Sequence, residues 1–128
     1  MKYLSVEEII LTHEYQLQMF GGIPGVRSIE LLESALFRPQ TSFDGKDLYE
    51  TVFLKAASLF HSLVKNHPFV DGNKRTGFVS AVTFLRANGY KFTIKQPDSV
   101  TLTLGVESGD LSLEQIAKKF EKHSAKIN

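Results

Sequence analysis

Residues 67–75 bring together the side chains that phosphate chemistry uses. They read HPFVDGNKR. The imidazole of His67 has an ordinary pKa near ~6.5, which suits a group that accepts a proton at neutral pH. The carboxylate of Asp71 is an oxygen ligand of the kind that holds Mg²⁺ together with nucleotide phosphates. The first half of this stretch therefore predicts a general base and a metal ligand.

The second half of the stretch has the composition of an anion site. Gly72 lets the backbone turn and lets a ligand approach closely. Asn73, Lys74 and Arg75 follow at the predicted start of a helix. Free backbone N–H groups and the helix dipole attract anions there, and the two cationic side chains add full positive charges. We interpret the whole stretch as a polyphosphate cradle.

The same residue types also have a purely structural interpretation, which the residues alone leave open. Asp71 can cap the next helix, Lys74 and Arg75 can form a solvated face, and His67 can be a hydrogen-bonded histidine. The sequence contains neither a P-loop nor the protein-kinase motifs. A zinc site at His61 and His67 is not expected, because no further ligand follows at suitable spacing.

The elements that position this stretch are predicted to be helices. A capping box at residues 5–8 opens the first one, and its apolar face includes His13, which we expect to be a hydrogen-bonded core histidine. Helix 74–88 is apolar nearly all round, so we expect it at the centre of the fold. The predicted helices cover approximately residues 5–18, 28–37, 48–66, 74–88, 99–106 and 112–120.

Three shorter segments are less regular. Tyr90, Phe92 and Ile94 alternate with polar residues, which indicates a short strand or an extended edge. Residues 38–47 are polar and rich in turn residues, which indicates an exposed loop or a small hairpin. Residues 99–106 also alternate, but a lone strand this late in the chain would lack a partner, so we predict a helix.

Composition bounds the class of protein. The chain has 128 residues, no cysteine, and 15 Lys and Arg against 14 Asp and Glu. This length fits one domain, residues 1–128, and the balanced charge gives no reason to expect direct binding to nucleic acid or to a membrane surface. We see no membrane span and no export signal, so we expect a cytoplasmic location.

The stretch 67–75 resembles the signature of the Fic/Doc superfamily, H-P-F-x-[D/E]-G-N-x-R, at every fixed position. Residues 21–27, 32–36, 38–40 and 88–90 are similar to the death-on-curing, or Doc, branch of that superfamily. The similarity covers nearly the whole chain and is weakest after residue 97, and Ser28 stands where the branch more often has Asp. The resemblance implies a mainly α, compact, single-domain helical bundle with at most a short strand or hairpin.

Two positions indicate which reaction the resemblance implies. Fic enzymes that transfer AMP generally carry Gly at the position of Lys74 and a second Arg at the position of Phe78. That Arg holds the terminal phosphates, so without it the nucleotide is expected to bind in the opposite direction and to present its γ-phosphate. The resemblance thus implies a Doc-type toxin that uses ATP and Mg²⁺ to phosphorylate a Ser or Thr of a cytoplasmic protein. The implied target is elongation factor Tu, and the implied outcome is arrest of translation.

The resemblance also implies a role for each residue of the stretch. His67 would be the general base, and Asp71 would coordinate Mg²⁺. Pro68 and Phe69 are expected to fix the loop against the core. Phosphate binding, through anion-hole donors or positive charges, is implied for four positions: Gly72, Asn73, Lys74 and Arg75.

Inhibition is expected to come from another protein. Some Fic proteins silence themselves with a helix that reads [S/T]-x-x-x-E-[G/N], and no Glu of this chain is followed by Gly or Asn. The resemblance therefore implies a Phd-like antitoxin whose C-terminal segment inserts into a groove near the active site. Residues 38–47 are a candidate for docking the target segment, as the flap does in Fic relatives, or are a plain surface connection.

Three other functions remain as alternatives. An AMP or other nucleotidyl transferase of the same fold is disfavoured by Lys74 and Phe78. A binding module without catalysis is disfavoured by the intact His67 and Asp71. An RNA-cleaving toxin is disfavoured by the balanced charge, because RNA binding requires a basic surface.

Overall fold

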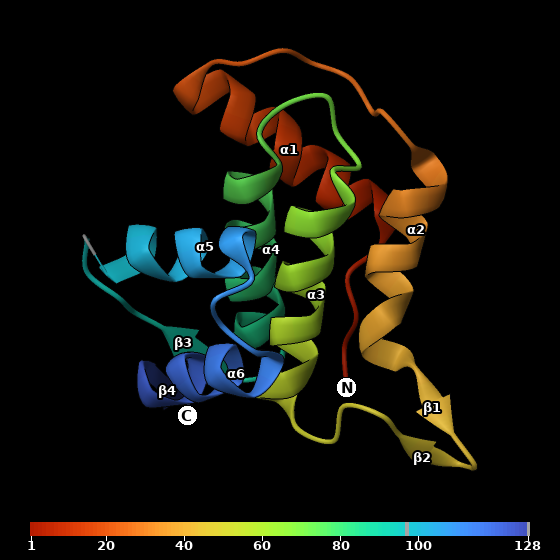
Figure 1. The fold of residues 1–128 in the computed structure, drawn as a ribbon, viewed down its shortest axis with the longest axis vertical. Helices are drawn as coiled ribbons and strands as arrows, with labels where there is room; N and C mark the ends of the chain where they lie inside the picture. Colours follow the sequence, from red (N-terminus) through yellow and green to blue (C-terminus); the bar gives the residue numbers. More distant parts are fainter. Residues whose placement is uncertain (97, 128) are drawn as a thin grey trace.

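Two long helices that lie side by side form the centre of the protein, and the loop between them carries residues 67–72 (Figure 1). They are α3 (Val52–Asn66) and α4 (Asn73–Ala87). The computed structural model describes residues 1–96 and 98–127. Because the connecting loop is short, the two helices run in opposite directions and hold the loop at one end of the pair.

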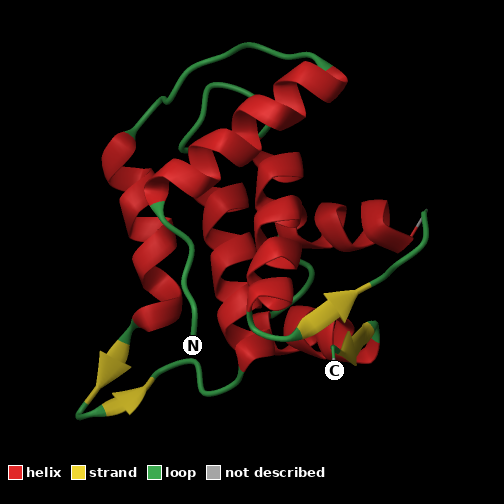
Figure 2. Cartoon of the chain, turned by 180° about the vertical axis from the view of Figure 1, so that it is seen from behind, coloured by secondary structure: helices red, strands yellow, loops and turns green. Residues whose placement is uncertain are grey.

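Four further helices of the described chain pack around this pair (Figure 2). α2 and α6 lie against α3, α1 packs on α4, and α5 contacts both central helices. No helix within the described residues is both long and apolar enough to cross a membrane. The mainly α bundle confirms the predicted fold class. The bounds are Val6–Phe20 for α1, Ile29–Phe37 for α2, Asp98–Ser108 for α5 and Leu113–Lys122 for α6, and a 3-10 turn, Arg38–Gln40, follows α2.

Side-chain caps determine where the helices begin. The predicted capping box at residues 5–8 is present at the start of α1, and a second capping box, at residues 112–115, opens α6. The hydroxyl of Thr51 accepts a hydrogen bond of 3.0 Å from the Leu54 N–H and caps α3. α3 therefore begins at Val52, later than the predicted start near residue 48.

α4 lies at the centre beside α3, as predicted, but α3 is the more deeply buried of the two helices. α3 is covered by α2, α4 and α6 on different sides. On α4, the apolar side chains of Phe78, Val79 and Val82 remain partly exposed. Phe78 and Val79 border an open groove beside α5, so part of the apolar surface of α4 has no covering helix.

The alternating pattern of residues 99–106 belongs to a helix, as predicted, and the structure explains the alternation. Leu102 and Val106 lie one turn apart on the buried side of α5. Val100 and Leu104 line the groove toward α1 and α4 and are 49% and 52% exposed. Residues two apart in an α-helix are separated by about 200° around its axis. A period of two therefore gives α5 two apolar stripes on opposite sides.

Both predicted extended segments form small antiparallel pairs. The hairpin consists of β1 (Ser42–Phe43) and β2 (Lys46–Asp47). The other pair joins β3 (Tyr90–Phe92) to β4 (Ser124–Lys126). The sequence did not predict β4, because three residues are too few to show an alternating pattern.

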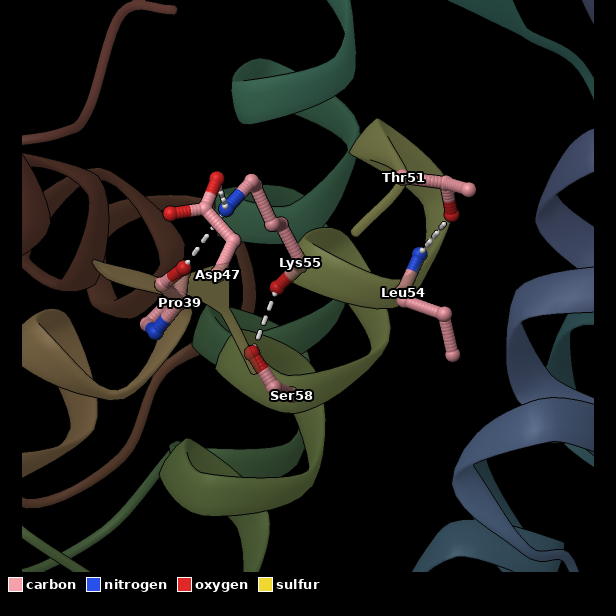
Figure 3. A network of polar contacts seen from close by, with 6 residues as sticks. All are labelled: Pro39, Asp47, Thr51, Leu54, Lys55 and Ser58. Atoms are coloured by element: carbon pink, nitrogen blue, oxygen red, sulfur yellow. Dashed lines mark hydrogen bonds and ion pairs between the residues drawn. The ribbon is translucent and has the colours of Figure 1, made fainter. Parts of the chain in front are cut away.

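A buried lysine fastens the hairpin to the start of α3 (Figure 3). Lys55 is 1% exposed, and its ammonium donates to the Asp47 carboxylate and to the Pro39 carbonyl, both at 3.1 Å. Between Lys55 and His67, α3 rises about 18 Å. The hairpin thus lies at the end of α3 remote from His67, which favours the second of the two interpretations of residues 38–47, a plain surface connection.

Candidate active site

The candidate loop begins at a histidine in an unusual backbone conformation. His67 ends α3 with φ 49° and ψ 56°, the left-handed region, which costs a non-glycine residue about 1 kcal/mol. Its side chain is exposed. The guanidinium of Arg27 donates from Nε to the His67 carbonyl at 2.6 Å and from Nη2 to the Asn66 carbonyl at 2.7 Å. Arg27 thereby caps the C-terminal end of α3 and fixes the backbone that carries His67.

The connection between α1 and α2 runs alongside the candidate loop, at the same end of the bundle (Figure 2). The N–H groups of Arg27 and Ser28 both donate to the Pro68 carbonyl, at 2.7 and 3.0 Å. The Val70 N–H donates to the Gly25 carbonyl at 3.0 Å. The sequence predicted no more here than a break between the helices over residues 5–18 and 28–37. A structural support role was missed, because hydrogen bonds between two distant loops leave no periodic pattern.

Asn73 closes the loop with its side-chain amide. Its Oδ1 accepts from the Phe69 N–H and its Nδ2 donates to the Phe69 carbonyl, both at 2.9 Å. Nδ2 also lies 3.5 Å from Nδ1 of His67, which is too long to fix the tautomer of that ring. The Asn73 side chain is therefore engaged within the loop. What it can offer an anion is its backbone N–H at the start of α4.

Two backbone groups hold the Asp71 side chain as a carboxylate. Oδ2 accepts from the Ile23 N–H at 3.1 Å, and Oδ1 accepts from the Gly72 N–H at 2.9 Å. The bond from Ile23, and next the bond from Gly72, hold the pKa of Asp71 below its usual range. The carboxylate is thus ionised at neutral pH, exposed to solvent, and connected to the α1–α2 loop.

A buried histidine of α1 supports the loop from beneath. His13 is 3% exposed, and its Nε2 donates to the Asp71 carbonyl at 2.7 Å. Its ring stacks on Phe69 with a centroid distance of 3.8 Å and an interplanar angle of 6°. The backbone of Gly72 passes so close that a Cβ there would lie 3.6 Å from the His13 ring. The prediction of a satisfied core histidine is confirmed, and this core histidine also positions the loop. Phe69 is buried, as predicted.

The two cations of the stretch lie on the first turn of α4 and both have partners. Lys74 Nζ lies 3.2 Å from a carboxylate oxygen of Glu107, at the end of α5. The guanidinium of Arg75 lies 4.4 Å from the ring centre of Phe20, at the end of α1. Lys74 and Arg75 both line an open groove of about 410 Å³ between α1, α4 and α5. Two of the four predicted phosphate-binding residues, Lys74 and Arg75, thereby lie on one solvent-accessible face.

Comparison with known proteins then assigns the family. Residues 3–85 match the sequence pattern of the Fic/DOC family. This chain belongs to the Fic/DOC family. It is 36% identical over 128 residues to the toxin Doc of Mycolicibacterium smegmatis, which covers 97% of this chain and 95% of that protein. It is 31% identical over 122 residues to the protein kinase doc of Escherichia phage P1, with 95% of each chain covered.

Family membership confirms the resemblance that the stretch 67–75 indicated. The matched residues include the whole loop and its supports, from His13 and Arg27 to Arg75, whereas α5 and α6 follow after residue 85. The predicted site residues of this Fic/DOC chain are therefore contiguous in space as well as in sequence, around the junction of α3 and α4. His61 is not among them. It lies on α3 before the loop, and its Nδ1 accepts a hydrogen bond of 2.8 Å from Arg38.

The Asp71 carboxylate fits a Mg²⁺ site in which the phosphates of a bound nucleotide provide further ligands. Each of its oxygens accepts one backbone N–H and keeps further capacity to bind a cation. The described residues contain no group of three His, Asp or Glu side chains that could hold a metal by themselves. Mg²⁺ commonly binds one or two carboxylates together with substrate phosphates. The site is compatible with that arrangement.

Proposed function

We propose that this protein is a Doc-type toxin that transfers the γ-phosphate of ATP to a Ser or Thr hydroxyl of a cytoplasmic protein. The observation that carries the proposal is the loop between α3 and α4, which joins an exposed His67, an ionised Asp71 and two cations at a helix start. One close relative is a toxin and another is a protein kinase. We propose elongation factor Tu as the target, so that the modification arrests translation.

The proposed reaction assigns a task to each end of the loop. The imidazole of His67 accepts the proton of the target hydroxyl as its oxygen bonds to the γ-phosphorus. The bond from that phosphorus to the bridging oxygen breaks, and ADP leaves. Asp71 would hold Mg²⁺, which supplies positive charge to the phosphates when it is bound. The N–H groups at the start of α4, with Lys74 and Arg75, hold phosphate oxygens.

The surroundings of Phe78 favour phosphoryl transfer over the alternative, nucleotidyl transfer. Phe78 occupies the position where AMP-transferring relatives are expected to carry a second arginine. Its ring packs edge-on against Phe60 and Phe92, at centroid distances of 5.9 and 6.0 Å. This position therefore offers apolar contacts to the core and no positive charge to a terminal phosphate. The cationic side chain that this chain adds instead is Lys74, four residues earlier.

The groove beside the cations is the proposed site of the Phd-like antitoxin. Its walls include the apolar side chains of Phe20, Val100 and Leu104, with Lys74 and Arg75 between them. An amphipathic segment with an acidic residue is complementary to such a groove in both shape and charge. Leu104→Asp should weaken binding of the antitoxin by at least tenfold, because it places an unpaired carboxylate on an apolar contact surface. Unchanged affinity would exclude this groove as the docking site.

Mass spectrometry of purified elongation factor Tu tests the proposed function. The factor is incubated with ATP and Mg²⁺ and with either the wild-type protein or the His67→Ala variant. We expect it to gain the mass of one phosphoryl group with the wild type and none with the variant. Gain of an AMP group would support nucleotidyl transfer. No gain of mass would refute the proposed target, and a toxic His67→Ala variant would support the binding module without catalysis.

A further inference from the structure

The ion pair between Lys74 and Glu107 connects the candidate phosphate site to α5. Lys74 Nζ lies 3.2 Å from Glu107 Oε2, and the two side chains are about half exposed. Lys65 Nζ donates to the backbone carbonyl of Glu107 at 2.7 Å. Lys65 lies on α3 two residues before His67, and Lys74 lies in the first turn of α4 on the other side of the loop. Glu107 is therefore held between the two helices that carry the loop.

The charge of Glu107 is unfavourable for the proposed ligand. A nucleoside triphosphate carries several negative charges, and a carboxylate in contact with the Lys74 ammonium both neutralises that ammonium and repels a phosphate that approaches it. Arg75, by contrast, faces the neutral ring of Phe20, which attracts its charge without neutralising it. The two cations of the cradle thus differ in the partner that the fold gives them.

We propose that Glu107 is a positioning residue that competes with nucleotide phosphate for Lys74, so that nucleotide binding requires the Lys74–Glu107 pair to separate. The inference rests on the proposed function, since it takes Lys74 as a phosphate ligand. Glu107 lies in α5, outside the residues that match the family pattern, so this restraint is contributed by the C-terminal part of the chain.

The expected effect is modest, because both partners of the pair are reached by solvent. Exposed ion pairs are worth little, and removal of the competing charge should tighten nucleotide binding by roughly two- to fivefold. Glu107→Gln removes the charge and keeps the shape of the side chain and the backbone carbonyl that Lys65 contacts. Higher ionic strength should reduce the gain, because salt screens charges at the surface.

A double-mutant cycle measured by isothermal titration calorimetry tests this inference. The full-length protein is titrated with ATP in the presence of Mg²⁺, as the wild type and as Glu107→Gln, Lys74→Met and the double variant. Lys74→Met keeps the aliphatic stem and removes the ammonium. Glu121→Gln is the matched control, because it removes one negative charge from the exposed side of α6, away from Lys74.

Three results together would support the inference. Glu107→Gln binds ATP more tightly than the wild type, Glu121→Gln binds it equally well, and Glu107→Gln has a smaller effect in the Lys74→Met background. Unchanged or weaker binding by Glu107→Gln would overturn it, since the carboxylate would then be neutral toward the nucleotide or would orient Lys74 for binding. The same gain in both backgrounds would overturn competition at Lys74. Failure of the wild type to bind ATP at all would refute the proposed function itself, and the inference with it.

Discussion

The contact between His13 and the candidate loop gives a prediction with two separable parts. The His13 ring stacks on Phe69 at 3.8 Å, and its Nε2 donates to the Asp71 carbonyl at 2.7 Å. His13→Ala removes both interactions and leaves a cavity in a site that is almost fully buried. His13→Phe keeps a stacked ring of similar size and removes only the hydrogen bond.

The expected costs follow from the two contacts. A stacked aromatic pair contributes about 0.5–1.5 kcal/mol beyond burial, and one hydrogen bond contributes about 1 kcal/mol. With the cavity included, His13→Ala should lower the free energy of unfolding by about 2–4 kcal/mol. His13→Phe should lower the free energy of unfolding by only about 1 kcal/mol. The Asp71 carbonyl does not become a buried unsatisfied group, because water can reach the exposed Asp71.

Urea unfolding of the two variants measures these costs, with Gln18→Ala, on the exposed side of the same helix, as the control. The control should stay within about 0.5 kcal/mol of the wild type. Amide hydrogen exchange of Phe69 and Val70 should become faster in His13→Ala, because both N–H groups belong to the supported loop. The reasoning is refuted if His13→Ala costs no more than the control, or if His13→Phe costs as much as His13→Ala.

Three further predictions concern the supports around the site. Arg27→Ala should lower the free energy of unfolding by about 1–2 kcal/mol, because it removes two hydrogen bonds to the end of α3. It should also reduce phosphoryl transfer more than His13→Phe does, since it frees the backbone of His67, and an unchanged transfer rate would argue against this clamp. Lys55→Met should lower the free energy of unfolding in urea by about 1–3 kcal/mol, because the buried Pro39 carbonyl loses its donor. It should leave the affinity for ATP unchanged. Weaker ATP binding would mean that the hairpin lies closer to the site than the structure shows. Burial, and then the charges of Arg38 and Lys65, hold the pKa of His61 below its ordinary value. As the pH falls, His61 therefore becomes protonated in the unfolded chain before it does so in the folded chain. Stability should therefore fall as the pH drops below about 6.5, and His61→Gln should flatten that part of the stability curve; an equally steep curve in the variant would contradict the assignment.

The helices and the residues of the candidate loop were predictable because both depend on local patterns. Apolar spacing and capping boxes are read within a few residues, and the stretch 67–75 is contiguous. The signature also indicated the family that the comparison with known proteins confirmed.

The supports of the loop were not predictable, because they join segments that are distant in sequence. Arg27 reaches His67 across forty residues, and the role of His13 depends on α1 lying beneath the loop. The position of the hairpin depended on Lys55, whose burial beside Asp47 no amphipathic pattern indicates. Tertiary packing also decided the core, since α2 and α6 cover α3, whereas part of the apolar surface of α4 borders an open groove.

The phosphate that is transferred is the central claim, and a label-transfer assay tests it most directly. The wild-type protein and His67→Ala are incubated with Mg²⁺ and a translation-competent lysate, with ATP labelled at the γ-phosphate in one reaction and at the α-phosphate in another. We predict a protein band that carries only the γ-label and that is absent with His67→Ala. A band that carries the α-label would contradict our interpretation of Lys74 and Phe78 and would make this protein a nucleotidyl transferase.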